Sequence, residues 1–269
     1  MGTDYPLPDY NDYPKDEILY EKHGEIAVVT LNTPPYNFMS PEAVVGIDAV
    51  MKIFDKDPDL RVAILTAAGT KAFSAGGDLD KCGKILGQTG GRDWFYPDQS
   101  KRFFSDIRKP IVCAVNGLCT AGGVEMMVGT DIRVAAEHAT FGLGEVKWGL
   151  VPGGGSHTRL PRQIPWAVAM EILLTGERIT AQRAYDIGLI NKVVPADQLM
   201  DAAFAYAKAI AANGPLAVRT AKEIVVRSFA LEPHFVYEGY MSDRIFGTED
   251  SREGPQAFLE KRKPVFKGR

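Results

Sequence analysis

The sequence predicts an α/β fold whose last quarter is helical. Two short apolar runs, RVAILT at 61–66 and IVCAV at 111–115, have the composition of strands buried on both faces. Strand, turn and helix patterns alternate through the first two-thirds of the chain, as they do in α/β folds. From Pro165 onward the spacing of apolar residues is helical.

The 269 residues fit one large domain, or one domain with a small appendage. We predict three parts. Residues 1–17 are acidic and proline-rich and form an irregular N-terminal extension. Residues 18–196 form the α/β core with the active site, and residues 197–269 form a helical C-terminal region.

The first predicted elements are a hairpin and a helix. Apolar residues alternate over 18–31 and are interrupted at His23-Gly24, which predicts two strands joined by a turn. The run Ser40-Pro41-Glu42 predicts a helix start, because serine caps free amides and proline fits the first turn. This helix runs to about Asp55, with its apolar residues on one face.

The middle of the chain alternates short strands with loops. Residues 67–80 form a loop rich in glycine and alanine, and the polar stretch 81–100 is expected to run over a pocket at the surface. The remaining predicted elements are a helix at 100–108, strands at 111–115 and 131–135, a short helix at 121–128, a mostly irregular segment at 141–155, a helix at 197–212 and two or three more helices up to about Lys261.

Composition argues against several classes of protein. The net charge of −3 offers no basic field for nucleic acid. The cysteines Cys82, Cys113 and Cys119 are odd in number and lack metal-ligand spacing, so we expect a reduced, cytoplasmic setting and no structural zinc. The N-terminus has neither signal-peptide nor transit-peptide character. No apolar run approaches the roughly 20 residues of a membrane span.

Two glycine-rich turns form the first half of a candidate site. FSAGGD at 73–78 and NGLCTAGG at 116–123 follow the two buried strands, where ligands bind in open α/β folds. One N–H group from each turn could converge on a single oxygen and form an oxyanion hole. Tight turns alone would also account for the glycines.

Two glutamates form the second half. Glu125 follows Gly122-Gly123 in the first turn of a predicted helix, and Glu145 lies between glycine and apolar residues. Burial raises the pKa of a carboxyl toward the range useful for proton transfer. The alternative is that both glutamates are ordinary solvent-exposed side chains. The residues that flank them in the sequence are mostly apolar or glycine, which argues against this alternative.

Other sites fit the sequence less well. The dinucleotide-binding motif GxGxxG is not met, because Lys147 stands where its third glycine is required. The sequence contains no phosphate-binding P-loop motif. Ala72 stands where the nucleophile-elbow motif GxSxG requires glycine. None of the histidines has metal-ligand spacing.

Four segments, KAFSAGGDL, KPIVCAVNGLCTAGGVEM, DIRVAAEHATFGLGEV and GLVPGGGSHTRLPR, resemble the enoyl-CoA hydratase/isomerase (crotonase) superfamily. The resemblance runs from about Ile18 to the end of the chain. It implies a crotonase-like spiral of ββα units with a helical C-terminal trimerisation region, and a homotrimer or a hexamer that is a dimer of trimers. It also implies an acyl-CoA thioester substrate of fatty acid metabolism. We expect no metal and no separate cofactor, because coenzyme A is part of the substrate.

The resemblance assigns roles to individual residues. Glu125 and Glu145 match the two catalytic glutamates of the hydratases, and the amides of Gly77 and Gly122 match the oxyanion hole. It further implies that the substrate is contacted by Ala75, Gly76, Asp78, Leu79, Gly153 and Lys261.

We therefore predict an enoyl-CoA hydratase, a hydro-lyase. Glu125 is assigned to deprotonate water and Glu145 to protonate Cα, although the sequence leaves the reverse division open. A double-bond isomerase or another acyl-CoA enzyme of this fold is the alternative within enzymes, and an acyl-CoA or RNA binder is the alternative outside them. Gly144 replaces a frequent proline, and the stretch 81–100 with its aromatic residues is unusual, so the identity of the acyl group stays open.

Overall fold

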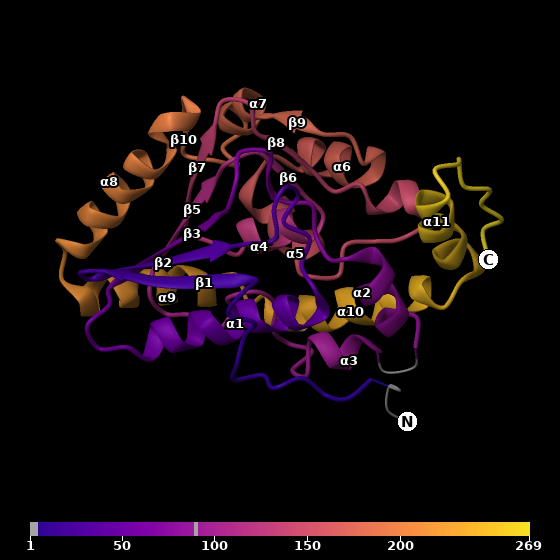
Figure 1. Cartoon of the computed structure of the whole chain (residues 1–269), viewed down its shortest axis with the longest axis horizontal. Helices are drawn as coiled ribbons and strands as arrows, with labels where there is room; N and C mark the ends of the chain where they lie inside the picture. The colour runs from indigo at the N-terminus through magenta and orange to yellow at the C-terminus, as the bar shows by residue number, and fades with distance from the viewer. Residues whose placement is uncertain (1–4, 89–90) are drawn as a thin grey trace.

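Two β-sheets organise the residues that the computed structural model describes, which are 5–88 and 91–269 (Figure 1). The six-stranded sheet has the order β1-β2-β3-β5-β7-β10 and the four-stranded sheet the order β4-β6-β8-β9. Neighbours are parallel except for β1 with β2 and β8 with β9. The strands are β1 (Ile18–His23), β2 (Ile26–Leu31), β3 (Val62–Ala67), β4 (Ala72–Ser74), β5 (Ile111–Val115), β6 (Leu118–Thr120), β7 (Ile132–Ala136), β8 (Thr140–Gly142), β9 (Ile179–Thr180) and β10 (Lys192–Val194).

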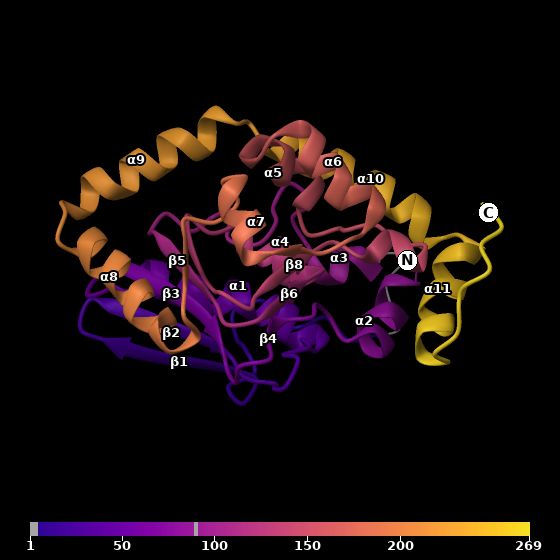
Figure 2. The ribbon, with the colours of Figure 1, turned by 90° about the horizontal axis from the view of Figure 1, so that it is seen from above.

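Helices cover both sheets and make up nearly all of the regular structure after β10 (Figure 2). The helices, with η for 3₁₀ helices, are α1 (Pro41–Lys56), α2 (Leu79–Leu86), α3 (Gly91–Phe95), α4 (Gly122–Met127), η1 (Glu145–Trp148), α5 (Ser156–Gln163), α6 (Trp166–Thr175), α7 (Ala181–Asp186), η2 (Ala196–Gln198), α8 (Leu199–Ala211), α9 (Pro215–Ser228), α10 (Glu232–Phe246) and α11 (Glu249–Leu259).

A strand–strand–helix unit recurs along the core. Each of β3, β5 and β7 in the large sheet is followed by a short strand of the small sheet and then by a helix. The Asn116 side chain joins two of the connecting turns, because its Nδ2 donates to the carbonyls of Ala67 at 2.9 Å and Gly69 at 2.6 Å. In the small sheet, Ser74 pairs with Cys119. The glycine turns that follow β4 and β6 are therefore neighbours.

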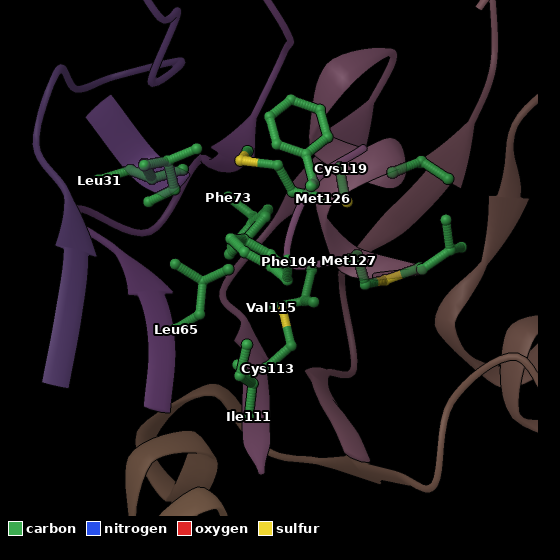
Figure 3. Packing of buried hydrophobic residues seen from close by; sticks show 14 of the residues in the cluster. Leu31, Leu65, Phe73, Phe104, Ile111, Cys113, Val115, Cys119, Met126 and Met127 are labelled. Atoms are coloured by element: carbon green, nitrogen blue, oxygen red, sulfur yellow. The ribbon is translucent and has the colours of Figure 1, made fainter. Parts of the chain in front are cut away.

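The hydrophobic core lies on both faces of the large sheet. Between the sheets, residues such as Leu65, Phe73 and Met126 pack together (Figure 3). On the opposite face, Ala203 and Ala207 of α8 pack against apolar side chains of the large sheet. Every residue of β3 and β5 is buried, which confirms that the two apolar runs are interior strands.

Several predicted elements are confirmed, and one is wrong. Ser40 caps α1, with its Oγ accepting from the Ala43 amide at 3.0 Å. Residues 100–108 form turns in place of the predicted helix. Side chains of α1 bind their amides, since Asp48 accepts from the Phe104 N–H at 2.9 Å and Asp55 from the Arg108 N–H at 3.0 Å. These contacts compete with helical hydrogen bonds.

Short elements interrupt the segments that we predicted to be irregular. Helices α2 and α3 occupy part of 79–95, with residues 89–90 outside the described chain. Asp78 begins α2 by accepting from the Asp80 and Lys81 amides. Residues 5–17 of the predicted extension contain no helix or strand, and residues 1–4 lie outside the described chain. The domain boundary near Ala196 stays a prediction.

No helix within the described residues is long and apolar enough to cross a membrane.

The close approach of α4 to β4 generates a stability prediction. A Cβ on Gly123 would lie 2.5 Å from the Ser74 carbonyl oxygen, so Gly123→Ala should lower the free energy of unfolding by about 1–3 kcal/mol. Gly83→Ala in α2 is the matched control, because a Cβ there meets nothing within 4 Å. It should raise stability by about 0.5–1 kcal/mol. Urea unfolding measures both, and equal effects would contradict this packing.

Candidate active site

The two glycine turns touch each other. Gly76 adopts a φ of +94°, and a Cβ at this position would lie 2.9 Å from the Ala121 Cβ. A Cβ on Gly122 would lie 3.7 Å from the Gly77 nitrogen. Within the described chain, the amides of Gly77 and Gly122 have no hydrogen-bond acceptor. Two free N–H groups of this kind, close together, suit a single incoming oxygen.

Backbone strain marks the second turn. Ala121, just before α4, has φ 52° and ψ −128°, a conformation that a non-glycine residue rarely adopts. Such a residue costs about 1–3 kcal/mol and persists where its surroundings fix it. Here the Ala121 N–H donates to the Gly142 carbonyl at 3.1 Å, which anchors the turn to β8. The same carbonyl accepts from the Thr120 hydroxyl at 2.9 Å.

Glu125 projects from α4 into the interior and is only 6% exposed. Its Oε1 accepts from the Gly154 N–H at 2.6 Å and from the Ser156 hydroxyl at 3.3 Å. Burial raises the pKa of Glu125 to about 7, the negative charge of Glu238 adds to this rise, and the two hydrogen bonds oppose it. A carboxyl with this pKa can accept or release a proton near neutral pH.

Glu145 begins η1 and belongs to the same site. The residue as a whole is partly exposed, but its Oε2 atom is fully buried and has no hydrogen-bond partner in the described chain. Burial raises the pKa of the Glu145 carboxyl to about 8, and the negative charge of Glu125 contributes further to this rise. The two carboxyls therefore lie within electrostatic reach, and each disfavours ionisation of the other.

The loop before α5 positions Glu125. A Cβ on Gly154 would lie 2.7 Å from Glu125 Oε2 and 2.8 Å from the Phe103 ring, so the carboxyl lies directly against this glycine. The preceding carbonyl, of Gly153, accepts from Nε of Arg102 at 2.9 Å. Arg102 is itself buried, and its NH2 group donates to the Phe235 carbonyl at 3.0 Å. The sequence predicted only Gly153 of this loop.

Helix α10 adds a third buried carboxylate. Glu238 Oε2 accepts from the Thr158 N–H at 3.1 Å and from the Thr158 hydroxyl at 3.0 Å, while Oε1 lies 4.0 Å from Arg102 Nε. Sequence reasoning missed Glu238, Ser156 and Arg102. Their local patterns carry no signal, because each acts through a contact between segments that are distant in the chain.

The other predicted substrate contacts fall into two groups. Residues Ala75 to Leu79 run beside the turn at Gly122, and the Ala75 N–H is held by the Tyr36 carbonyl at 3.0 Å. Lys261 is exposed just after α11, and its side chain bonds to none of the other predicted site residues in the described chain. However, α11 packs against η1, where the rings of Phe258 and Trp148 are 5.0 Å apart. The C-terminal helix thus supports the segment that carries Glu145.

Among the described residues, no group of three or more histidine, cysteine or acidic side chains could hold a metal ion. All three cysteines are free and buried.

Comparisons with known proteins agree on one family. The family model described as enoyl-CoA hydratase/isomerase matches residues 21–269. The chain is 40% identical to the enoyl-CoA hydratase EchA19 of Mycobacterium tuberculosis, over 94% of this chain and 97% of that protein. It is 38% identical to the carnitinyl-CoA dehydratase of Citrobacter koseri, over 94% of this chain and 99% of that protein. The crystal structure of carnitinyl-CoA hydratase from Mycobacterium avium superposes with a TM-score of 0.85 at 34% identity, covering 95% of this chain and 100% of that chain.

The raised pKa values predict how stability depends on pH. An unfolded glutamate titrates near pH 4.5, whereas Glu125 and Glu145 titrate near 7 and 8 in the folded chain. From about pH 5 to 8 the folded state holds more protons, so the free energy of unfolding falls as pH rises, by up to about 1.4 kcal/mol per pH unit for each proton retained.

When urea unfolding is measured across this pH range, the free energy of unfolding should therefore fall less steeply with pH for Glu145→Gln than for the unsubstituted chain. Glu171→Gln, at an exposed position of α6, is the control and should leave the slope unchanged. Equal slopes in all three proteins would show that the buried pair does not retain protons.

Proposed function

Because the chain is an enzyme that belongs to the enoyl-CoA hydratase/isomerase family, we propose that it adds water across the 2,3 double bond of a 2-enoyl-CoA thioester. One observation carries this proposal. Two buried carboxyls with raised pKa values lie within electrostatic reach of each other, and one of them, Glu125, follows Gly122 by one turn of α4, where the amides of Gly77 and Gly122 have no acceptor in the described chain. Hydration needs both parts, a site for negative charge on the thioester oxygen and groups that move two protons.

The amides of Gly77 and Gly122 hold the thioester oxygen in this proposal. Attack of water on C3 pushes electrons through Cα to this oxygen, and the enolate that forms is stabilised by the two N–H groups. The contact between the two turns supports the assignment, as does the lack of acceptors for these amides among the described residues. Loss of one such donor typically lowers the rate by about 10²–10³.

The two glutamates divide the proton transfers. Glu125 orients and deprotonates the water, and the hydrogen bonds from Gly154 and Ser156 to its Oε1 hold the carboxyl in place for this role. Glu145 protonates Cα, since its higher pKa and unpartnered Oε2 suit a donor. The proton gained by Glu125 and the proton lost by Glu145 balance, so one exchange between them restores the starting state. The reverse division is the competing assignment.

Further substrate contacts are proposed from the family resemblance. The backbone of Ala75 to Leu79 meets the coenzyme A, Gly153 borders the reacting carbons, and Lys261 reaches a phosphate of coenzyme A. We propose no metal and no redox cofactor, because hydration changes no oxidation state overall and the amides already stabilise the charge.

Assembly into a homotrimer, or a hexamer that is a dimer of trimers, is part of the proposal. Helix α9 buries none of its residues, although it carries apolar side chains. The exposed apolar residues of α9 and α10 include Leu216, Ile224, Val225, Val236, Tyr237 and Tyr240. A second copy of the chain would cover these faces. We further propose a cytoplasmic setting, which the three free cysteines support.

Dehydration of a 3-hydroxyacyl-CoA is the same reaction in the opposite direction. Relatives named carnitinyl-CoA dehydratase make this direction a second candidate. A double-bond isomerase is the third, and it would need only one of the two carboxyls.

Loss of the ultraviolet absorbance of crotonyl-CoA tests the hydratase. We expect the intact chain to hydrate it, and Glu125→Gln and Glu145→Gln each to lower kcat by about 10²–10⁴ while coenzyme A binding persists. The control Glu171→Gln should match the intact chain. Full hydratase activity in Glu125→Gln would refute the two-carboxyl mechanism, and double-bond migration that survives in this variant would favour the isomerase.

A further inference from the structure

In the part of the chain that the structure describes, the two terminal nitrogens of one buried arginine outside the catalytic groups have no hydrogen-bond partner. Arg92, in α3, is 5% exposed, and within the described chain neither of its terminal nitrogens has an acceptor. The carboxylate of Asp243 forms the ion pair with Arg92, but its Oδ1 lies 3.8 Å from Nη1, which is too far for a hydrogen bond. Burial of a guanidinium without hydrogen-bond acceptors costs free energy of folding. A negatively charged ligand that bound here would offset this cost.

The surface of α10 places Arg92 near the proposed site. A Cβ on Gly239 would lie within 2.4 Å of the guanidinium atoms NH1, NH2 and Cζ, so the group lies flat against this glycine, and α3 and α10 are side by side (Figure 1). Ser242 lies three residues further on the same buried face, and its Oγ is 4.0 Å from the Cβ position of Gly153. Residues three apart on a helix are about 5–6 Å from each other.

A second link to the catalytic carboxyls runs through Tyr96. This partly buried side chain lies four residues after Arg92 and within electrostatic reach of both Glu125 and Arg92. Arg92 is thus close to Gly153 through α10 and close to Glu125 through Tyr96.

Charged side chains of both signs lie near Arg92. Arg102 lies close enough to lower the pKa of Arg92, in addition to the effect of burial. Asp243 is the opposing charge, but its side chain is 58% exposed, and water therefore weakens its attraction. Glu238 is a second negative charge within electrostatic reach; its Oε2 accepts from Thr158, and its Oε1 has no hydrogen-bond partner in the described chain. The two unpartnered nitrogens of Arg92, and not the net charge around them, therefore favour an anionic ligand.

We propose that Arg92 binds a carboxylate at the end of the acyl group, so that the preferred substrates are 2-enoyl-CoA thioesters derived from dicarboxylic acids. The two free nitrogens of Arg92 can bind a carboxylate in a bidentate pair, and Gly239 leaves the space in which the guanidinium lies. This inference rests on the proposed function for the nature of the acyl-CoA ligand. It makes Arg92 a residue that determines specificity and gives it no part in the proton transfers.

Binding of saturated acyl-CoAs tests the inference without turnover. Adipyl-CoA and hexanoyl-CoA have acyl chains of equal length and differ by a terminal carboxylate in place of a methyl group. Calorimetry on the intact chain should give adipyl-CoA at least about tenfold tighter binding than hexanoyl-CoA. A thioester that ends in a trimethylammonium group should bind more weakly than either. Equal or tighter binding of hexanoyl-CoA would overturn the inference, as would preference for the cation.

Variants separate recognition from a structural role of Arg92. Arg92→Met should abolish the preference for adipyl-CoA, and Arg92→Lys should retain part of it. Asp243→Asn removes the competing carboxylate and should increase the preference. If Arg92 only supports the fold, Arg92→Met will weaken both ligands equally and Asp243→Asn will leave their ratio unchanged, and either result overturns the proposal.

Hydration assays keep the two proposals apart. Turnover of crotonyl-CoA together with equal affinities for the saturated pair would overturn the role of Arg92 and leave the hydratase proposal standing. A preference for adipyl-CoA in a chain that hydrates no enoyl-CoA would support the role of Arg92 and refute the hydratase proposal.

Discussion

The hydrogen bond from the Gly154 amide to Glu125 is the contact on which the rest of the site depends. It joins α4 to the loop before α5 at 2.6 Å, and Arg102 holds that loop through the neighbouring Gly153 carbonyl. Because Gly154 has no side chain, the carboxyl can lie against the backbone. Burial raises the pKa of Glu125 although this hydrogen bond opposes the rise, and the charge of Glu125 in turn raises the pKa of Glu145.

The repeated strand–strand–helix unit explains why the amides and the carboxyls meet. Parallel pairing of β4 with β6 brings the turns at Gly77 and Gly122 together, and α4 then begins at the second turn and carries Glu125. Pairing of β6 with β8 leads the chain to Glu145 at the start of η1. The same architecture that buries the core therefore places the proposed catalytic groups just after the carboxyl ends of β4, β6 and β8.

Sequence patterns predicted the parts of the structure that depend on local chemistry. The α/β class, the buried strands β3 and β5, the Ser40 cap and the family resemblance are confirmed. The helix predicted at 100–108 was wrong, because Asp48 and Asp55 of α1 bind its amides. The supports of Glu125 at Gly154 and Ser156 could not be predicted, since a tertiary contact and no local pattern brings them together. The catalytic and substrate-binding roles of the individual residues stay predictions.

Difference infrared spectroscopy of the carboxyl groups tests the central claim most directly, since it observes whether the buried pair holds a proton near neutral pH. Between about pH 6 and pH 9, the band of a protonated carboxyl should disappear in the intact chain, because Glu125 and Glu145 both lose their protons in this range. Glu145→Gln should show a smaller loss. A spectrum with no carboxyl titration above pH 6, or one that Glu145→Gln leaves unchanged, would contradict the account.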